Sequence, residues 1–439
     1  MTVSSEFTRQ LMALDPAPHT LVVAFSGGVD SQVLLALAVD YAKAHRLGLR
    51  AVHINHNLSP NAEQWQAFCE RYCQQYEVEF FAHSVQLTKN GGDSLEQIAR
   101  QARYQVLSQY VQHGELLLTG QHLDDQAETF LLALKRGSGP KGLSAMPLLK
   151  PFANGHLMRP LLSLTRREIE AFARQRQLTW AEDESNRDVR FDRNFLRHQV
   201  LPSLNQRWPH FSQAVARTAQ ICAEQEALLQ ELLSEKLAQY TAQNGGLSID
   251  GLANESPTSR RYLLRMWMME QGWPAVERKH LTIIWQQIAM AKNDANPVFE
   301  YGHYCVRRFD GWLFLDTVKQ DISRWRSRLV LEQPQTLPDG LGELRLTTMA
   351  SSRQLMRPQQ EWWLCFDPAG LVAHPVERGR RRKLKKIFQE YGVPSWQRRR
   401  IPIIVTPQQQ VVAVAGLFVD RAFAGDDLGI QWQQESKGK

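Results

Sequence analysis

Short apolar runs alternate with amphipathic stretches along the first third of the chain. Leucine-rich or β-branched runs predict strands at Thr20–Phe25, Arg50–Asn55, Val78–His83 and Glu115–Gly120. Apolar residues at helical spacing predict helices at Ser31–His45, Ala62–Tyr76, Ser94–Gln112 and Asp124–Leu134. Such alternation indicates right-handed βαβ units, and therefore an α/β fold with a doubly wound parallel sheet.

The pattern changes after about residue 212. Long helical stretches follow at Gln213–Tyr240, Ser259–Gln271 and Val276–Met290. From Leu329 onward short β-like runs, "IPIIVT" and "VVAVAG", surround a basic segment. We therefore expect three domains: a catalytic domain over 1–212, an α-rich middle domain over 213–328, and an α+β C-terminal domain over 329–439.

Composition narrows the class of protein. The chain has 439 residues, of which 43% are hydrophobic and 22% charged, as in ordinary globular proteins. We find no run of eighteen apolar residues and no secretory signal in "MTVSSEFTRQ", so we expect no membrane partner. Five cysteines are too few for a disulfide framework and favour a reducing, cytoplasmic location.

The positive charge is concentrated in one segment. The net charge is +7, and Glu377 to Arg400 holds ten Lys/Arg and two Glu, a net of +8, which leaves about −1 for the rest. A single basic patch indicates a polyanionic partner such as RNA, although a charge run can also be a solvated face.

The stretch "VVAFSGGVDSQ", Val22 to Gln32, predicts an anion-binding loop. An apolar strand ends in Ser-Gly-Gly and a helix begins near Asp30. Glycines let backbone N–H groups approach a phosphate, and the helix N-terminus adds partial positive charge. Asp30 can cap the helix or bind Mg²⁺. A tight strand–helix turn with a good cap would show the same residues.

A second polar cluster follows the "ELLLTG" strand. His122, Asp124 and Asp125 come directly after it, and Glu128 lies one turn further along the predicted helix. The spacing lets all three carboxylates lie on one side of the first turn. They can bind a cation, either a metal ion or an amine, or simply favour the positive end of the helix.

These motifs resemble a known family. The loop lacks the Walker A pattern and is similar to the PP-loop, S-G-G-x-D-S, of N-type ATP pyrophosphatases, which have the adenine nucleotide α-hydrolase-like fold. "G-Q-H-L-D-D-Q-A-E-T" with "R-G-S-G-P-K-G-L", "MRPLL", the block Glu182 to Pro202 and the segment Arg380 to Ile404 together resemble the tRNA(Ile)-lysidine synthetases. The resemblance covers most of the chain.

The resemblance implies an enzyme that uses ATP and Mg²⁺. Its substrates would be L-lysine and the tRNA(Ile) with a CAU anticodon. ATP adenylates the C2 oxygen of the wobble cytidine and releases diphosphate. The lysine ε-amine then displaces AMP, and the codon read changes from AUG to AUA.

Site residues follow from the motifs and this resemblance. We expect ATP to contact Ser26, Gly27, Gly28, Val29, Asp30, Ser31 and His53, although a lone strand-end histidine is more often structural. Asp30 and Asp124 would hold the metal ion, and Asp125 and Glu128 the substrate lysine. The catalytic set is Asp30, Arg100, Asp124, Asp125 and Glu128. Arg100 could equally be a solvated arginine.

Two basic clusters are candidates for tRNA binding, because arginine suits phosphate contacts. The first contains Arg187, Arg190, Arg193, Asn194 and Arg197, and the second Arg380, Arg381, Arg382, Lys383, Lys385 and Lys386. Phe191 lies between Arg190 and Arg193 in the sequence, and its ring could stack on a base or be buried in the core. In the same block, Asp183, Ser185 and Asn186 could order the loop.

Two other functions stay open. A tRNA thiolase with a PP-loop would need a reactive cysteine, but Cys69 and Cys73 share an apolar helix face and fit a core better. A non-catalytic ATP-dependent RNA-binding protein would not need the acidic cluster. We expect a homodimer as one candidate assembly.

Overall fold

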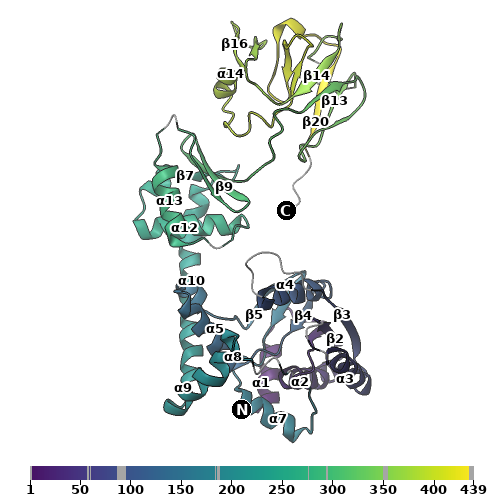
Figure 1. Ribbon diagram of the computed structural model, residues 1–439, viewed down its shortest axis with the longest axis vertical. Coiled ribbons are helices and arrows are strands. Elements are labelled where there is room, and N and C mark those ends of the chain that lie inside the picture. The colour runs from purple at the N-terminus through teal and green to yellow at the C-terminus, as the bar shows by residue number, and fades with distance from the viewer. Residues whose placement is uncertain are drawn as a thin grey trace. The chain divides into compact units, whose positions relative to one another are not determined.

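The computed structural model describes residues 2–56, 59, 61–86, 95–182, 184, 188–274, 276–292, 295–349 and 354–434. The chain forms two compact units, 1–231 and 232–439. Figure 1 shows the helices and strands of each unit. No helix within these ranges is both long and apolar enough to cross a membrane.

The first unit is built on a six-stranded sheet with the order β3-β2-β1-β4-β6-β5. Its strands are β1 (Thr20–Ala24), β2 (Gly48–Asn55), β3 (Glu79–Ser84), β4 (Glu115–Leu118), β5 (Leu149–Phe152) and β6 (Gly155–Met158). All neighbours are parallel except the edge strand β5, which is antiparallel to β6. The sheet is therefore the predicted parallel one, extended by a hairpin.

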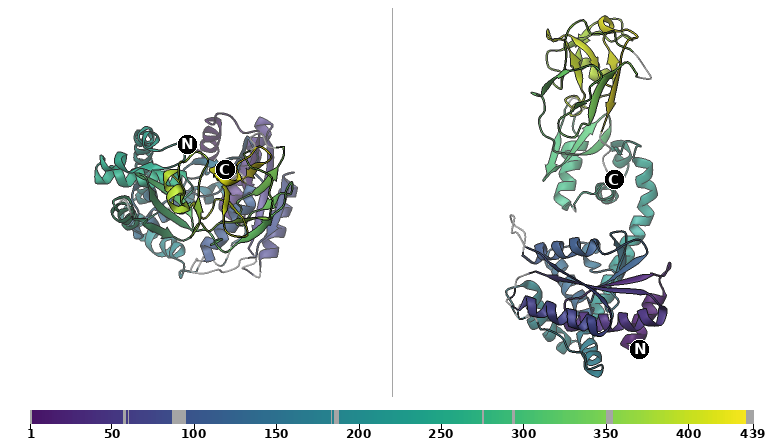
Figure 2. Two further views of the ribbon diagram at one scale, coloured as in Figure 1. Left: turned by 90° about the horizontal axis from the view of Figure 1, so that it is seen from above. Right: turned by 90° about the vertical axis from the view of Figure 1, so that its right-hand side faces the viewer.

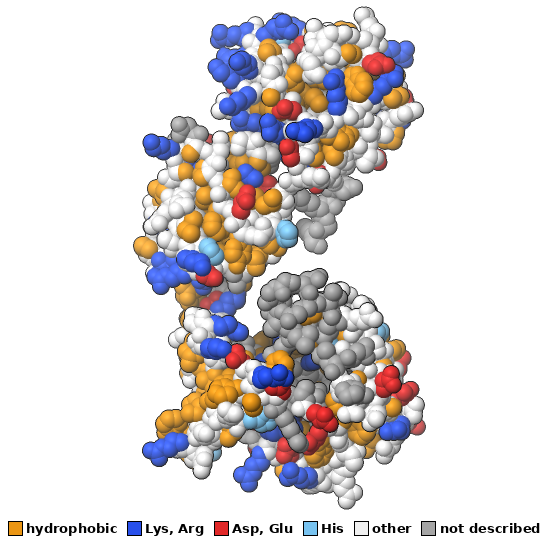
Figure 3. Space-filling model, in the orientation of Figure 1, with side chains coloured by type: hydrophobic (Ala, Val, Ile, Leu, Met, Phe, Trp, Pro, Cys, Tyr) orange, Lys and Arg blue, Asp and Glu red, His pale blue; other side chains and the backbone are white. Residues whose placement is uncertain are grey.

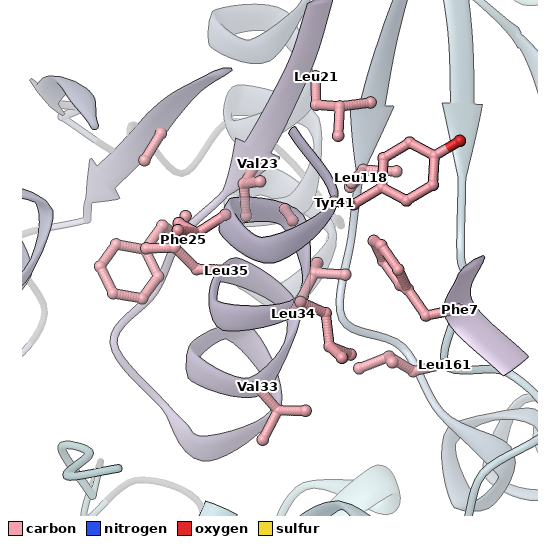
Figure 4. Packing of buried hydrophobic residues seen from close by; sticks show 14 of the residues in the cluster. Phe7, Leu21, Val23, Phe25, Val33, Leu34, Leu35, Tyr41, Leu118 and Leu161 are labelled. Carbon is pink, nitrogen blue, oxygen red and sulfur yellow. The ribbon is translucent and has the colours of Figure 1, made fainter. Parts of the chain in front are cut away.

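Helices cover both faces of this sheet (Figures 1 and 2). One face carries α1 (Val3–Met12), α2 (Val29–His45), α3 (Ala62–Gln75) and α7 (Arg166–Gln175), around a core that includes Phe7, Val33 and Leu118 (Figure 4). The other face carries α4 (Leu95–Ser108), whose Leu107 packs with Val22 and Leu157. Successive residues of a strand point to opposite faces, so Leu21 and Val23 of β1 enter the first core and Val22 enters the second.

The strand order reverses direction between β1 and β4. From β1 the chain moves outward through β2 to β3, crosses back by α4, and continues from β4 to β6. Loops at such a switch point leave a crevice at the carboxyl edge, where α/β proteins bind ligands. The Gly27 loop after β1 and the acidic cluster after β4 flank this crevice.

The rest of the first unit is helical. It contains α5 (Leu123–Lys135), α6 (Pro140–Leu143), α8 (Asp192–Phe195) and α9 (Leu201–Arg207), with a π-helical turn at Leu196–Val200 between the last two. Helix α10 (Phe211–Tyr240) runs from the first unit into the second. Its Leu237 is buried, whereas Leu228 and Leu232 are exposed.

The second unit begins with a helical part that has its own small sheet. Its helices are α11 (Ile249–Ala253), α12 (Pro257–Glu270) and α13 (Arg278–Ile283), extended by a π-helical turn at Ile284–Ala289. The sheet has the order β7-β10-β9-β8, with β7 (Leu247–Ser248), β8 (Val298–Tyr301), β9 (Tyr304–Phe309) and β10 (Trp312–Thr317). Trp267 and Leu313 join helices and sheet in one core.

The remainder of the second unit is mostly β-structure. A five-stranded sheet contains β11 (Arg326–Leu329), β14 (Trp362–Cys365), β17 (Ile403–Val405), β18 (Val411–Val414) and β19 (Phe418–Val419). A three-stranded sheet contains β12 (Gln335–Thr336), β13 (Glu343–Thr347) and β20 (Gly429–Gln433). The pair β15 (Val372–Ala373) and β16 (Arg382–Lys383) precedes α14 (Leu384–Glu390), and a 3-10 turn lies at Arg421–Phe423.

The predicted fold class is confirmed: a parallel α/β sheet, a helical middle region and a β-rich C-terminal region. The expected strands and helices of the first unit form close to the predicted bounds. The expected cap Ser94 lies outside the described residues. Helix α7 and the β5–β6 hairpin were not predicted, and α7 contributes Arg166 to the wall of the crevice.

Candidate active site

The loop after β1 is shaped by its first glycine. Gly27 has φ +84°, and a Cβ there would lie 2.8 Å from the Cys69 Sγ atom on α3. Both the backbone and the close packing therefore require glycine. The Gly27 carbonyl accepts a hydrogen bond from the Ala181 N–H, and Ser26 Oγ lies 3.1 Å from Ser31 Oγ. The loop is held from three sides at the N-terminus of α2, as an anion site requires.

Asp30 lies in the first turn of α2 and faces the crevice. Its Oδ2 accepts a hydrogen bond of 2.6 Å from Arg166 Nη1, and its Oδ1 lies 3.7 Å from His122 Nε2. That Oδ1 is buried and has no hydrogen-bond partner. Burial raises the pKa of the Asp30 carboxyl, although His122 and Arg166 oppose the shift. An orphaned buried oxygen of this kind fits a bound cation.

The acidic cluster begins helix α5 with His122 as its N-cap. The Asp124 N–H donates to His122 Nδ1, and His122 Nε2 lies 3.7 Å from Asp30 Oδ1 and 3.5 Å from Asp125 Oδ2. Asp125 Oδ2 accepts from the His122 N–H and closes a capping box. Asp124 Oδ2 accepts from the N–H of Arg166, the first residue of α7. Two helix N-termini therefore hold the aspartates in place.

Glu128 is fully buried and is bound by arginines from the chain after α7. Arg197 Nε and Nη2 donate to its two oxygens at 2.7 and 3.0 Å, and the same Nη2 donates to Asp125 Oδ1 at 2.8 Å. Arg193 Nε lies 3.5 Å from Glu128 Oε2. Burial raises the pKa of Glu128, and Arg197 opposes the shift.

A cavity of about 200 Å³ opens beside these side chains. It is lined by His122, Asp124, Glu128, Arg166, Arg197, Leu201, Pro202 and Asn205. The carboxylates and guanidinium groups in its wall give it both signs of charge. It can therefore accept a small zwitterion, such as an amino acid, more readily than an apolar molecule.

His53 is buried at the carboxyl end of β2. Its Nδ1 donates to the Phe25 carbonyl at 2.9 Å, immediately before the Gly27 loop. Burial lowers the pKa of its imidazole, so the ring is neutral near pH 7. His53 therefore stabilises the backbone at the start of the Gly27 loop. Its contact with ATP stays a prediction.

Some of the predicted basic residues of the first unit are exposed, and others face the acidic cluster. Arg100 is exposed on α4, over the Tyr104 ring. Arg190 is exposed and pairs with Asp188, and the Asn194 amide donates to the Asp188 carbonyl. Arg193 and Arg197 instead face the acidic cluster. Arg187, Asp183, Ser185 and Asn186 lie outside the described residues.

Phe191, which precedes α8, is 41% exposed. The alternative that it is a core aromatic is therefore wrong. A ring open to solvent remains available for stacking on a base.

The basic segment of the second unit divides into two parts. Arg380, Arg381, Lys383, Lys385 and Lys386 are exposed around β16 and α14, where Lys and Arg side chains gather (Figure 3). Arg382 there pairs with Glu390. In contrast, Arg400 pairs with Asp339 and donates to the Gln320 carbonyl, and Arg398 donates to the Val393 carbonyl. The first part, unlike Arg398 and Arg400, is exposed and can meet a polyanion.

Cys69 and Cys73 are fully buried in the core of the first unit. Burial raises the pKa of both thiols, that of Cys73 to about 12. Thiols of this kind are unreactive. Among the described residues, moreover, no group of three or more His, Cys, Asp or Glu could hold a metal ion. That result does not test Mg²⁺, which needs only one or two carboxylates beside phosphate oxygens and water.

Sequence reasoning missed Arg166 and did not assign His122 a role. The signal for Arg166 was Thr165 with Glu168 three residues later, the capping-box spacing that starts a helix. Nothing local indicated that this helix would begin opposite Asp30 and Asp124.

Comparisons with known proteins point to one family over nearly the whole chain. Family models match a PP-loop domain at residues 3–204, a TilS substrate binding domain at 247–314, and a TilS substrate C-terminal domain at 363–434. The tRNA(Ile)-lysidine synthase of Vibrio vulnificus (strain CMCP6) is 51% identical over 98% of this chain and 99% of its own. That of Vibrio cholerae serotype O1 (strain ATCC 39315 / El Tor Inaba N16961) is 52% identical over 94% of each.

More distant similarities exist among solved structures. The U34-tRNA thiolase NcsA from Methanococcus maripaludis with its [4Fe-4S] cluster is 16% identical, with a TM-score of 0.43 over 51% of this chain and 78% of its own. The NMN synthetase from Francisella tularensis is 14% identical, with a TM-score of 0.32 over 49% and 94%. Similarities this distant do not bear on the function.

Proposed function

The chain belongs to the tRNA(Ile)-lysidine synthase family, and on that basis we propose that it joins free lysine to C2 of the wobble cytidine in the tRNA(Ile) with a CAU anticodon. ATP provides the activation and leaves as AMP and diphosphate. The observation that supports this most directly is the convergence of Asp30, Asp124, Asp125 and Glu128, from two helices that follow neighbouring parallel strands.

The first step activates the base. The cytidine O2 atom attacks the α-phosphorus of ATP, a P–O bond forms, and diphosphate departs. The amide groups of the Gly27 loop and the N-terminus of α2 suit the negative charge that develops on phosphate oxygens. In this proposal Ser26, Gly28, Val29 and Ser31 contact the nucleotide together with Gly27.

The second step is amine transfer. The lysine ε-amine, after losing a proton, attacks C2, and the C2–O bond to AMP breaks. Glu128 and Asp125 are candidates to bind the ammonium group and accept its proton, since burial raises the pKa of Glu128 toward that of a useful base. The cavity beside them also offers Arg166 and Arg197 to the carboxylate of lysine.

Mg²⁺ fits the same crevice. The orphaned Asp30 Oδ1 and the nearby Asp124 carboxylate are the groups that would hold it. Bound there, the ion would neutralise charge on the triphosphate. Substituting Asp30→Ala should abolish diphosphate release, whereas unchanged release would reject this role for Asp30.

Each predicted domain has a role in this reaction. The PP-loop part, 1–212, performs the chemistry, with Arg100 near the nucleotide or the activated oxygen. The parts 213–328 and 329–439 bind tRNA, through the exposed basic residues around α14 in the latter. We place the enzyme in the cytoplasm and expect a homodimer. A molar mass near 50.4 kDa in light scattering would instead identify a monomer.

The function is tested by incubating the protein with tRNA(Ile), ATP and isotopically labelled lysine. We expect AMP formation together with labelled RNA whose digested nucleosides include a cytidine that has gained lysine. Omitting lysine should leave diphosphate release but no labelled RNA. Absence of both products with active, folded protein would refute the proposal.

The thiolase alternative has a direct test. The double substitution Cys69→Ser/Cys73→Ser changes Cys69, which packs against Gly27, and Cys73, which lies one turn further along α3. We expect AMP formation to survive in this variant. Loss of activity in a variant that remains folded by circular dichroism would favour sulfur chemistry.

A further inference from the structure

A group of positive side chains lies on the α4 face of the sheet, at its carboxyl edge. Leu157 of β6 is buried in the core beneath α4, so Arg159, two residues later, points to the same face just beyond the strand end. Lys150 of β5 is the cross-strand partner of Leu157 and therefore shares that face. Arg159 and Lys150 therefore lie next to the apolar core at the carboxyl edge of the sheet, where α/β proteins bind their ligands.

Tyr104 of α4 lies at the centre of this group. The Arg100 guanidinium lies 5.0 Å and the Lys150 ammonium 5.6 Å from the centroid of its ring. Burial raises the pKa of the Tyr104 hydroxyl, yet Arg100, Arg159 and Lys150 outweigh it and the net shift is downward. Three positive charges therefore converge on one phenol.

The positive charge of this group favours the binding of an anion. Arg159 is only 2% exposed, and its Nε has no hydrogen-bond partner. Burial, followed by Arg159, lowers the pKa of Lys150. Within the described ranges no carboxylate forms an ion pair with Arg100, Lys150 or Arg159. Arg159 is thus a buried cation whose partners, the Pro147 carbonyl and Tyr104, are not carboxylates, and proteins keep such a cation where a ligand can supply the negative charge.

We propose that Arg100, Lys150 and Arg159 form a second phosphate-binding site, which takes a phosphodiester group next to the reacting cytidine, and that Arg100 acts there rather than on the nucleotide. This inference rests on the proposed function for the identity of the polynucleotide. The Gly27 loop after β1 already serves the phosphates of ATP. A base bound in the crevice beyond the carboxyl ends of β1 and β4 brings its own flanking phosphates, and β6 is the strand next to β4, about 5 Å away.

A purely structural role explains the position of Arg159 but not those of Lys150 and Arg100. Arg159 Nη1 donates to the Pro147 carbonyl at 2.7 Å and so pins the chain before β5. That contact explains why one N–H of Arg159 is buried. It does not explain why Lys150 and Arg100 approach the same phenol, since neither is needed for the brace.

The test measures binding without turnover. Lys150→Gln removes one charge from a half-buried residue, and Lys43→Gln on the exposed C-terminal part of α2 is the matched control. With tRNA(Ile) and no ATP or lysine, Lys150→Gln should weaken binding about three- to tenfold at 0.15 M salt. The slope of log Kd against log salt should fall by about 0.7–0.9, as for one lost phosphate contact. Lys43→Gln should match the parent.

A second arm identifies the source of the phosphate. Inorganic diphosphate is titrated into the parent and Lys150→Gln proteins. Weaker tRNA binding with unchanged diphosphate binding supports the proposed phosphodiester. Weaker diphosphate binding with unchanged tRNA binding retains a phosphate site but assigns it to the nucleotide and overturns the phosphodiester. Unchanged binding of both overturns the site.

Arg159→Lys provides an independent variant, because it keeps the charge but loses the planar fork. We expect it to weaken tRNA binding while circular dichroism remains that of the parent. Because neither arm needs catalysis, a failure here is separate from a failure to form lysine-modified RNA.

Discussion

Arg197 Nε lies 2.7 Å from Glu128 Oε1, although 69 residues separate the two along the chain. Glu128 has no exposed surface, and the side chain of Arg197 is 31% exposed. The guanidinium therefore occupies the position that a substrate ammonium would need. Lysine must either displace this contact or bind beside it.

Removing the arginine should destabilise the first unit. Arg197→Ala leaves a buried carboxylate unpaired, and we expect a loss of about 3 kcal/mol, at the lower end for a buried pair because Arg197 is partly exposed. The double variant Arg197→Ala/Glu128→Gln should recover much of the loss. Calorimetric unfolding checks this, with Arg190→Ala, whose side chain is 87% exposed, as a control that leaves the transition unchanged. Equal losses in single and double variants would contradict it.

Asp30 should make stability depend on pH. Its pKa is raised by burial, so the folded state holds the proton more tightly than the unfolded state does. The stability from this group is present below the usual carboxyl range and is lost as pH rises through the folded pKa. The melting temperature of Asp30→Asn, relative to the parent, should therefore increase from pH 4 to pH 7. Asp40→Asn, in an exposed ion pair, is the control; a parallel trend in both variants would remove Asp30 as the cause.

Glu128 should affect lysine more than ATP. Glu128→Gln keeps the shape of the side chain but removes the charge that would attract an ammonium group. We expect KM for lysine to rise about tenfold or more, and KM for ATP to change less than threefold, as loss of one charged contact predicts. Steady-state AMP formation at varied lysine and varied ATP provides both values. Equal increases in the two would move Glu128 to the nucleotide.

The exposed basic residues around α14 should control the salt dependence of tRNA binding. The triple variant Arg381→Gln/Lys385→Gln/Lys386→Gln should weaken binding and reduce the salt slope by about 2–3. The matched control is Lys279→Gln/Lys292→Gln/Arg328→Gln, which removes the same charge elsewhere in the second unit. Filter binding at several salt concentrations distinguishes them; identical slopes for both triple variants would show that total charge, rather than this surface, determines binding.

The sequence by itself determined the local parts of the site. The alternation of apolar runs predicts the parallel sheet, because strand and helix periodicities are read over a few residues. The Ser26–Ser31 loop and the cluster from His122 to Glu128 are likewise continuous in sequence, so both motifs could be found at the ends of β1 and β4. That the two motifs meet depends on β1 and β4 being neighbours in the sheet, which the structure shows.

Only the tertiary structure decided which charges meet. Arg166 pairs with Asp30 across 136 residues, and Arg197, whose binding to RNA stays a prediction, pairs with Glu128. His53 turned out to support the Gly27 loop, and Arg159 and Lys150 lie close to Arg100 and Tyr104 of α4. Such pairings depend on crossovers and hairpins that bring distant segments to one edge, and no local spacing encodes them, because a side chain's partner is set by packing rather than by its neighbours in sequence.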